Sequence, residues 1–207
     1  MRQTDTKTKI FFAAVELFSE SGYKNVSMRD LAQKIDIKPA SIYNHYESKE
    51  KILDALLDYY LERMDQFYSE LNEFHFKISA DSELEDVLEQ LLLSYRVEER
   101  ELMFHLTRIV HHEQFSSPKA ADALVGGGYR KYMEEHVKFF DRLSEAGLVT
   151  GTEHNHMYGE LFARISLTFA TQFLHPDIPP TLKTQAELYH FVIPLVVNYE
   201  KAKKLAQ

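Results

Sequence analysis

A short segment near the N-terminus carries polar side chains whose types and spacing suit hydrogen bonding to a nucleic acid. Ser41, Asn44 and His45 follow the dipeptide Lys38-Pro39 closely enough to share one short helix. A helix of this size fits the major groove of B-DNA, where base edges present distinct patterns of donors and acceptors. The segment is therefore a candidate for direct reading of DNA bases.

The ten histidines raise a second chemistry, the binding of a metal ion. The densest groups are His111-His112-Glu113 and Glu153-His154-Asn155-His156. Adjacent residues on a helix point about 100° apart, so His111 and His112 cannot easily hold one ion together. Solvated or hydrogen-bonded histidines are favoured over a metal site, and no metal or other cofactor is expected.

Other catalytic chemistry finds no support in the residues. The chain contains no cysteine, which excludes a thiol nucleophile and a disulfide framework and fits a reducing compartment. No serine lies in a Gly-x-Ser-x-Gly motif. No apolar stretch is long enough to span a bilayer, and the polar N-terminus leads into no signal-peptide core. A cytoplasmic protein that is not an enzyme is expected.

The charge distribution places any nucleic-acid surface in the first quarter of the chain. The 207 residues carry a net charge of −8. Residues 1–51 contain nine Lys and Arg against seven Asp and Glu, whereas the remaining residues contain fifteen against twenty-five. A mildly basic segment attached to a strongly acidic one is expected to meet DNA with its basic part.

Helical signals around the polar segment predict a helix-turn-helix. Residues 6–21 form an amphipathic pattern that Gly22 is placed to end. Ser27 with Asp30 resembles a capping box, and Pro39 suits a first helical turn, which together predict helices over 27–35 and 39–46. The residues expected to pack these two helices together are Leu31, Ile35, Ile37 and Ile42.

The rest of the chain shows the same three- and four-residue periodicity. Helices are predicted over 48–68, 82–112, 129–146, 157–174 and 182–205, with breaks at 116–118 and 126–128 and a kink at Pro194. The predicted fold is all-α, with a three-helix DNA-binding domain over residues 1–50. This domain is fused to a helical ligand-binding and dimerisation bundle over residues 51–207.

Five segments of the first quarter share their register and order with a known family. They are Ala14-Val15-Glu16-Leu17-Phe18, Gly22-Tyr23, Val26-Ser27-Met28-Arg29-Asp30-Leu31-Ala32, Lys38-Pro39-Ala40-Ser41-Ile42-Tyr43-Asn44-His45-Tyr46 and Ser48-Lys49-Glu50. Residues 10 to about 55 thereby resemble the DNA-binding domain of TetR-family repressors. The remaining residues share with the family only the length and helical character of its ligand-binding domain.

The resemblance implies a role for each matching polar residue. Ser27 would cap the second helix and offer a donor to a phosphate, and Arg29 would reach a phosphate or a base edge. Asn44 would be the main base reader, because an amide can pair bidentately with adenine. Lys49 would hold a phosphate at a helix N-terminus. The remaining expected contacts are Lys38, Pro39, Ala40 and Ser41 in the groove, and Tyr43 and His45 on the DNA backbone.

Alternatives and departures accompany these roles. Half-buried packing for Tyr43, an uninvolved surface position for His45 and a plain three-helix cap on a larger bundle are the competing interpretations. Asp36 stands at the turn position where the family usually has glycine, and would have to take the left-handed conformation. Glu47 stands where a basic residue is common, and its carboxylate would weaken affinity for phosphates.

The larger segment is rich in aromatic residues, since residues 52–207 hold 20 of the 26 Phe and Tyr side chains. A helical domain of this composition suits an apolar cavity with a few polar groups, although ordinary core packing is the alternative for each residue. The candidate wall residues are Phe67, Tyr95, Phe104, His105, Arg108, Tyr132, His136, Phe139, Phe162 and Phe169.

Apolar stripes on the last two predicted helices are candidates for pairing two copies of the chain. Pairing is favoured over burial within one chain, because a short reading helix gains specificity mainly when two copies act together. The candidate interface residues are Leu161, Ile165, Phe169, Leu188, Val192, Leu195 and Tyr199.

These observations predict a ligand-responsive transcriptional repressor. It would bind a palindromic operator as a homodimer and be released by a small, largely apolar inducer. Its expected partners are double-stranded DNA, the inducer and a second copy, with no membrane. The alternative is a helical metal-dependent enzyme or metal sensor that uses the histidine clusters.

Overall fold

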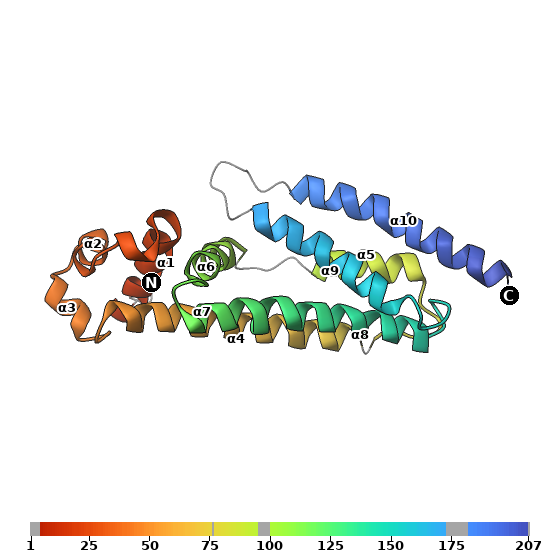
Figure 1. Cartoon of the computed structure of the whole chain (residues 1–207), viewed down its shortest axis with the longest axis horizontal. Coiled ribbons are helices and arrows are strands. Elements are labelled where there is room, and N and C mark those ends of the chain that lie inside the picture. The colour runs from red at the N-terminus through yellow and green to blue at the C-terminus, as the bar shows by residue number, and fades with distance from the viewer. Residues whose placement is uncertain (1–4, 76, 95–99, 173–181, 207) are drawn as a thin grey trace. The chain divides into compact units, whose positions relative to one another are not determined.

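A computed structural model describes residues 5–75, 77–94, 100–172 and 182–206, and within these ranges the chain is helical and contains no strand (Figure 1). The elements are α1 (Thr6–Ser21), η1 (Tyr23–Asn25), α2 (Met28–Lys34), α3 (Pro39–Tyr43), α4 (Lys49–His75), α5 (Leu84–Ser94), α6 (Arg100–Glu113), α7 (Pro118–Asp122), η2 (Ala123–Arg130), α8 (Lys131–Glu145), α9 (Asn155–Gln172) and α10 (Leu182–Ala206). The prediction of an all-α fold is confirmed. Among the described residues, no helix is both long enough and apolar enough to cross a bilayer.

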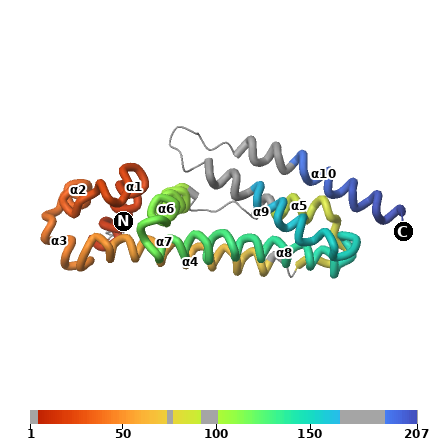
Figure 2. Tube along the Cα trace, in the orientation of Figure 1, coloured from red at the N-terminus to blue at the C-terminus, as the bar shows by residue number. Residues whose placement is uncertain are grey.

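The helices pack into two compact units. The first unit comprises Met1–Asp65 and Glu99–Gly128, and the second comprises Gln66–Glu98 and Tyr129–Gln207. By packing, therefore, α6 and α7 join the N-terminal helices, and α4 runs from the first unit into the second (Figure 2). The predicted division at residue 50 concerns function and stays a prediction.

Helix α1 begins and ends at residues whose chemistry favours those positions. The Asp5 carboxylate accepts a hydrogen bond from the Thr8 amide at 3.0 Å, which caps the first turn. Gly22 takes a φ of 81° and its N–H donates to the Phe18 carbonyl at 3.0 Å, so the helix ends as predicted. The buried face includes Ile10, Ala14 and Phe18.

Helix α6 completes the core of the first unit by packing on α1. Leu106, Ile109 and Val110 are buried within the same apolar cluster as the inner face of α1. His105 Nδ1 also lies 2.6 Å from the hydroxyl oxygen of the buried Ser19. One polar contact within an apolar interface favours a single alignment of the two helices. In any other alignment the Ser19 hydroxyl and the His105 ring would lose each other as hydrogen-bond partners.

The second unit is built around the crossing of α8 and α9. A Cβ added at Gly159 would lie 2.8 Å from the Val137 Cα, so only glycine allows α9 to approach α8 this closely. The Phe140 ring contacts the rings of Tyr158 and Phe162, with centroids 5.2 and 5.3 Å apart. Val196 and Val197 of α10 join this core.

The predicted helix over residues 82–112 is described as two helices, α5 and α6, which belong to different compact units. The predicted continuity across residues 95–99 lies outside the described residues. Helix α4, in contrast, is longer than its predicted range of 48–68.

The predicted break at Gly126–Gly128 is wrong, because these glycines lie in a π-helical turn, η2. A Cβ at Gly127 would meet the flexible end of the Leu61 side chain, and one at Gly128 would lie 3.3 Å from the Tyr60 hydroxyl. Gly127 and Gly128 thus pack against α4 within a continuous helical segment. At the predicted break over 116–118, α7 begins at Pro118, and the Ser117 hydroxyl oxygen accepts a hydrogen bond from the Ala120 amide.

Candidate nucleic-acid interface

The start of α2 is held by a reciprocal pair of side chains. Ser27 donates to the Asp30 carboxylate through both its backbone N–H and its hydroxyl, each at 2.7 Å, while the Asp30 amide donates to the Ser27 hydroxyl oxygen at 3.3 Å. These hydrogen bonds lower the pKa of Asp30 below its ordinary value. The capping box predicted from the sequence is present. Both Ser27 donors face Asp30, so the phosphate contact of this residue stays a prediction.

The turn between α2 and α3 contains a left-handed aspartate. Asp36 has a φ of 54°, and it is the one non-glycine residue with a positive φ among the described residues. Its N–H donates to the Gln33 carbonyl at 3.2 Å, and the next N–H, from Ile37, donates to the Ala32 carbonyl at 3.0 Å. This pair of bonds is a Schellman motif with aspartate at the position that usually takes glycine.

Helix α3 presents one buried and one exposed face. Ile42 is fully buried, and it packs with Leu31 in the core of the unit. The helix ends at Tyr43, earlier than predicted, since the His45 and Tyr46 amides both donate to the Ile42 carbonyl. On the opposite side the predicted contact residues are exposed: Lys38, Pro39, Ala40, Tyr43, Asn44 and His45, with Ser41 half-buried.

Three further charged residues complete this surface. Arg29, an expected contact residue, and Glu47, an expected departure from the family, are both exposed. Lys49 lies at the start of α4 as predicted, but its ammonium donates to the carbonyl oxygens of Tyr23 and Val26, at 2.8 Å each. The structure therefore brings nine of the ten predicted contact residues to the helix-turn-helix surface and turns the tenth toward the protein.

Residues 10–56 match the sequence model of a family described as bacterial regulatory proteins, tetR family. The N-terminal domain of this chain belongs to the TetR family. The match covers α1 to the start of α4, so the prediction of a helix-turn-helix domain of this family is confirmed.

Relatives of this TetR-family domain include a named repressor. The chain is 36% identical over 85 residues to the biofilm operon icaADBC HTH-type negative transcriptional regulator IcaR of Staphylococcus epidermidis, a match covering 36% of this chain and 46% of IcaR. The chain thus spans less than half the length of this relative.

Solved structures extend the likeness in fold to nearly the whole chain. A putative TetR-family regulator from Mesorhizobium loti superposes with a TM-score of 0.61 at 17% identity, covering 98% of each chain. The regulator FadR from Bacillus subtilis, solved in complex with stearoyl-CoA, superposes with a TM-score of 0.60 at 17% identity, covering 92% of this chain and 97% of that one. At such low identity these likenesses concern the fold.

The predicted pocket residues are divided between the two compact units. Phe104, His105 and Arg108 lie half-buried on α6 in the first unit, and His105 is bonded to Ser19. The members in the second unit are Phe67, Tyr132, His136, Phe139 and Phe162. The structure does not describe Tyr95 or the side chain of Phe169. A common ligand pocket stays a prediction.

The outer faces of α9 and α10 carry exposed apolar side chains in the second unit. On α9 Met157 and Leu161 are 55% and 41% exposed, and on α10 Phe191, Leu195 and Tyr199 are 65%, 55% and 46% exposed. Spacings of four residues put each set in one row along its helix. Sequence reasoning missed Met157, because this residue precedes the periodic apolar run of α9.

Two predicted interface residues lie elsewhere. Val192 is buried in the core of the second unit, and Ile165 packs partly buried against the same core. Val192 faces inward because it follows Phe191 by one residue, which turns it about 100° around the helix. The side chains of Phe169 and Leu188 are outside the described residues.

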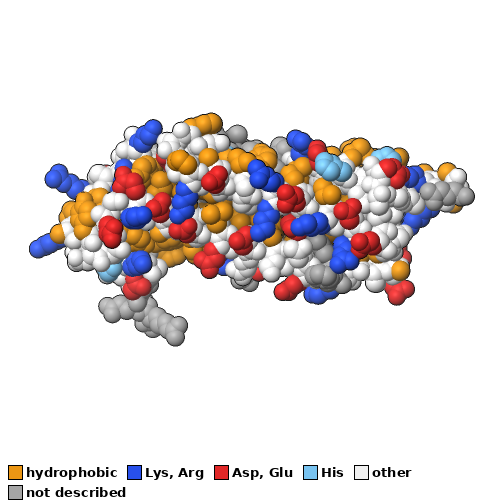
Figure 3. Space-filling view, turned by 60° about the horizontal axis from the view of Figure 1, so that its bottom comes forward, with side chains coloured by type: hydrophobic (Ala, Val, Ile, Leu, Met, Phe, Trp, Pro, Cys, Tyr) orange, Lys and Arg blue, Asp and Glu red, His pale blue; other side chains and the backbone are white. Residues whose placement is uncertain are grey.

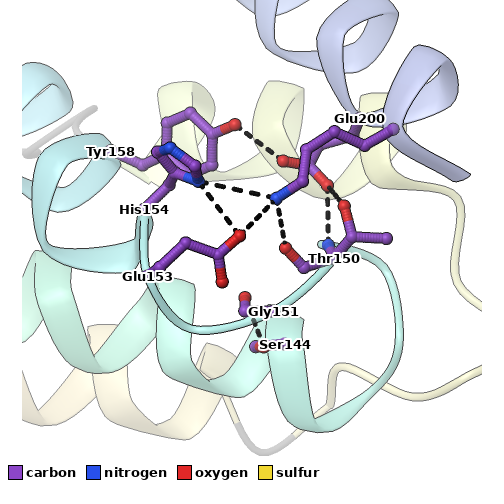
Figure 4. A network of polar contacts seen from close by, with 8 residues as sticks. Ser144, Thr150, Gly151, Glu153, His154, Tyr158 and Glu200 are labelled. Atoms are coloured by element: carbon purple, nitrogen blue, oxygen red, sulfur yellow. Dashed lines mark hydrogen bonds and ion pairs between the residues drawn. The ribbon is translucent and has the colours of Figure 1, made fainter. Parts of the chain in front are cut away.

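A polar network that the sequence did not reveal joins these two helices (Figure 4). The buried Glu200 carboxylate of α10 accepts hydrogen bonds from the Tyr158 hydroxyl and the Thr150 amide, both at 2.6 Å, and from the Thr150 hydroxyl at 2.5 Å. Burial opposes ionisation of Glu200, but these hydrogen bonds outweigh it and lower its pKa. Lys203 and Lys204, on the same face of α10, donate to the carbonyls of Thr150 and Gly147 at 2.7 and 2.8 Å.

The glutamates of the two histidine clusters bind other groups of the protein. Glu153 accepts a hydrogen bond from Lys203 at 2.8 Å, which lowers its pKa to about 2 and places an ammonium group where a metal ion would have to bind. In the other cluster, Glu113 accepts from the Ser116 hydroxyl at 2.6 Å. Within the described ranges, no three His, Asp or Glu residues are placed to hold one ion. The alternative of a metal-dependent enzyme or sensor is not favoured.

Proposed function

We propose that this chain is a transcriptional regulator that reads double-stranded DNA with α3. The supporting observation is the row of exposed side chains on a short helix whose other face is buried against α2. Asn44 reads a base with its amide, and Arg29 contacts a phosphate or a base edge. Lys38, Pro39, Ala40 and Ser41 enter the groove with the first turn of the helix, where the Lys38 ammonium still reaches a phosphate, and Tyr43 and His45 contact the DNA backbone.

The regulator acts as a two-fold dimer through α9 and α10. Five large apolar side chains exposed on neighbouring helices are more than a single soluble chain needs at its surface, and such rows mark interfaces. A second copy seated on this face gives a four-helix interface. Two recognition helices about 34–36 Å apart would then match successive major grooves of a palindromic site.

A small, largely apolar ligand controls DNA binding in this proposal. The buried aromatic residues of the second unit and the stearoyl-CoA complex of FadR support an apolar ligand. Helix α4 is the mechanical link, because it begins beside the helix-turn-helix and continues into the second unit. Coupling of about 1–3 kcal/mol suffices, and reciprocity requires DNA to weaken ligand binding by the same factor.

Selection of a binding site from a random-sequence DNA pool tests the proposal. The wild-type protein should enrich a palindrome and bind it more tightly than a scrambled duplex. Asn44→Ala should weaken binding to the selected duplex by about 1–3 kcal/mol, the value of one bidentate base contact, and should leave the scrambled duplex unchanged. Gln33→Ala, an exposed substitution on α2, serves as the control. Failure to enrich any sequence would contradict the proposed function.

A further inference from the structure

Lys49 is held on three sides by the protein. Its ammonium donates to the Tyr23 and Val26 carbonyl oxygens and lies 4.2 Å from the centroid of the Tyr23 ring. A cation over the face of an aromatic ring is attracted to it, and two charge-assisted hydrogen bonds add to that attraction. A DNA phosphate would have to compete with all three partners for this one side chain.

The contact with Val26 acts on the first peptide unit of α2. The Val26 carbonyl and the Ser27 N–H belong to the same planar peptide bond. Lys49 binds the carbonyl end of this unit, and Asp30 binds the N–H end at 2.7 Å. The orientation of the peptide that begins α2 is thus fixed from both sides, once from α4 and once from within α2.

We propose that Lys49 is a positioning residue and not a phosphate ligand. It ties the start of α4 to the start of α2, so that Arg29 on α2 meets DNA in register with α3. The inference rests on the proposed function, because it concerns how the same surface recognises DNA. It assigns the electrostatic attraction for phosphates to exposed side chains such as Lys38.

Salt dependence separates a positioning residue from a phosphate ligand. A lysine that neutralises one phosphate releases counterions, so log K falls more steeply with log salt concentration. Loss of such a lysine makes this negative slope shallower by about 0.9. For Lys49→Ala we expect the wild-type slope on the duplex selected by the wild-type protein. Affinity for this duplex should fall roughly tenfold, the effect of one lost charge-assisted hydrogen bond, and affinity for a scrambled duplex should fall less.

Lys38→Ala is the matched comparison. This substitution should make the salt slope shallower and should weaken binding to the selected and the scrambled duplex equally. Lys49→Arg is the second variant, in case Lys49→Ala folds poorly. Arginine still pairs with a phosphate, but its planar guanidinium does not fit a site shaped by two carbonyls and one ring around an ammonium. We expect Lys49→Arg to keep the slope and lose preference for the selected duplex.

Each outcome bears on the proposal. A slope reduced by about 0.9 in Lys49→Ala, or full preference for the selected duplex in Lys49→Arg, would show a phosphate ligand and overturn the inference alone. A wild-type protein with no salt-dependent DNA binding would overturn the proposed function as well. Unchanged slopes with reduced preference in the Lys49 variants, beside a reduced slope in Lys38→Ala, would support the inference.

Discussion

At the scale of single residues, the turn between α2 and α3 depends on a backbone conformation that aspartate adopts only at a cost. Asp36 has a φ of 54° and stands just past the C-terminal end of α2, where its negative charge also faces the negative end of the helix dipole. The TetR-family domain tolerates this backbone strain and this unfavourable charge because the two hydrogen bonds of the Schellman motif are formed.

Replacing Asp36 with glycine should therefore stabilise the domain. We expect Asp36→Gly to raise the free energy of unfolding by about 1 kcal/mol, since glycine takes a positive φ without steric strain. The melting temperature should rise by roughly 2–4 °C. Thermal unfolding followed by circular dichroism measures the change, with Asp36→Val as the opposite case. A lower melting temperature for the glycine variant would contradict this account.

His136 gives the second unit a dependence on pH. It is fully buried on α8, and burial lowers its pKa from 6.5 to about 4. Between these values the unfolded chain binds a proton that the folded chain does not, so the stabilising contribution is complete above pH 6.5 and is lost as pH falls toward 4.

The histidine can be tested by comparing urea unfolding at neutral and mildly acidic pH. His136 should account for up to about 1.4 kcal/mol of lost stability per pH unit within its window. His136→Leu should lose less stability than the wild-type protein on acidification. His156→Leu, on a side chain that is 73% exposed, should behave like the wild-type protein. Equal losses in the wild-type protein and His136→Leu would show that His136 titrates normally.

At the scale of elements, α9 and α10 are aligned by the network around Glu200. The exposed apolar rows lie on these two helices, so their alignment decides whether the rows form one surface. The loop between α8 and α9 lies against the last turns of α10, where Glu200, Lys203 and Lys204 bind its backbone (Figure 4). Side chains spaced three and four residues apart on one helix thereby hold a loop that has no secondary structure to fix it.

Removing the Glu200 carboxylate should destabilise the second unit by about 3 kcal/mol, because the buried Tyr158 hydroxyl and the half-buried Thr150 amide lose a charged acceptor. Glu200→Ala should show this loss as a lower urea midpoint. Glu200→Gln keeps one acceptor oxygen and should lose less. Lys201→Ala, at an exposed neighbouring position, is the control. Equal urea midpoints for Glu200→Ala and Lys201→Ala would show that the network around Glu200 does not stabilise the second unit.

At the scale of the whole molecule, the proposed function makes DNA binding depend on assembly. Acidic and basic side chains are interspersed on the face shown in Figure 3, so no single field of charge dominates that face. The net charge of −8 opposes approach to DNA, so the mildly basic residues 1–51 would have to face the duplex in the proposed complex. Specificity also requires two recognition helices held at one spacing.

A charged substitution in the apolar rows should separate the dimer. We expect Leu195→Glu, at a position 55% exposed in the single chain, to give monomers in sedimentation velocity at concentrations where the wild-type protein is dimeric. Affinity for the selected duplex should fall, because each monomer then binds one half-site alone. Lys201→Glu changes charge on the same helix away from the rows and should remain dimeric. A monomeric wild-type protein would contradict the proposed assembly.

Local signals in the sequence determined the helix-turn-helix. The bonds that define it, such as Ser27 with Asp30 and Gly22 with Phe18, join residues three or four positions apart, and residue types at such spacings have known preferences. The family resemblance implied which surface contacts DNA, and its matching residues lie within these locally determined elements.

Only the tertiary structure decided the features that depend on distant parts of the chain. Lys49 binds carbonyls 26 and 23 positions away, and Glu200 binds Thr150 across 50 positions. Gly127 lies within a helical turn and faces Leu61 of α4, 66 positions earlier in the chain. A single sequence shows which residues are apolar and how they are spaced. Contacts between side chains far apart in the sequence are decided only when the helices pack.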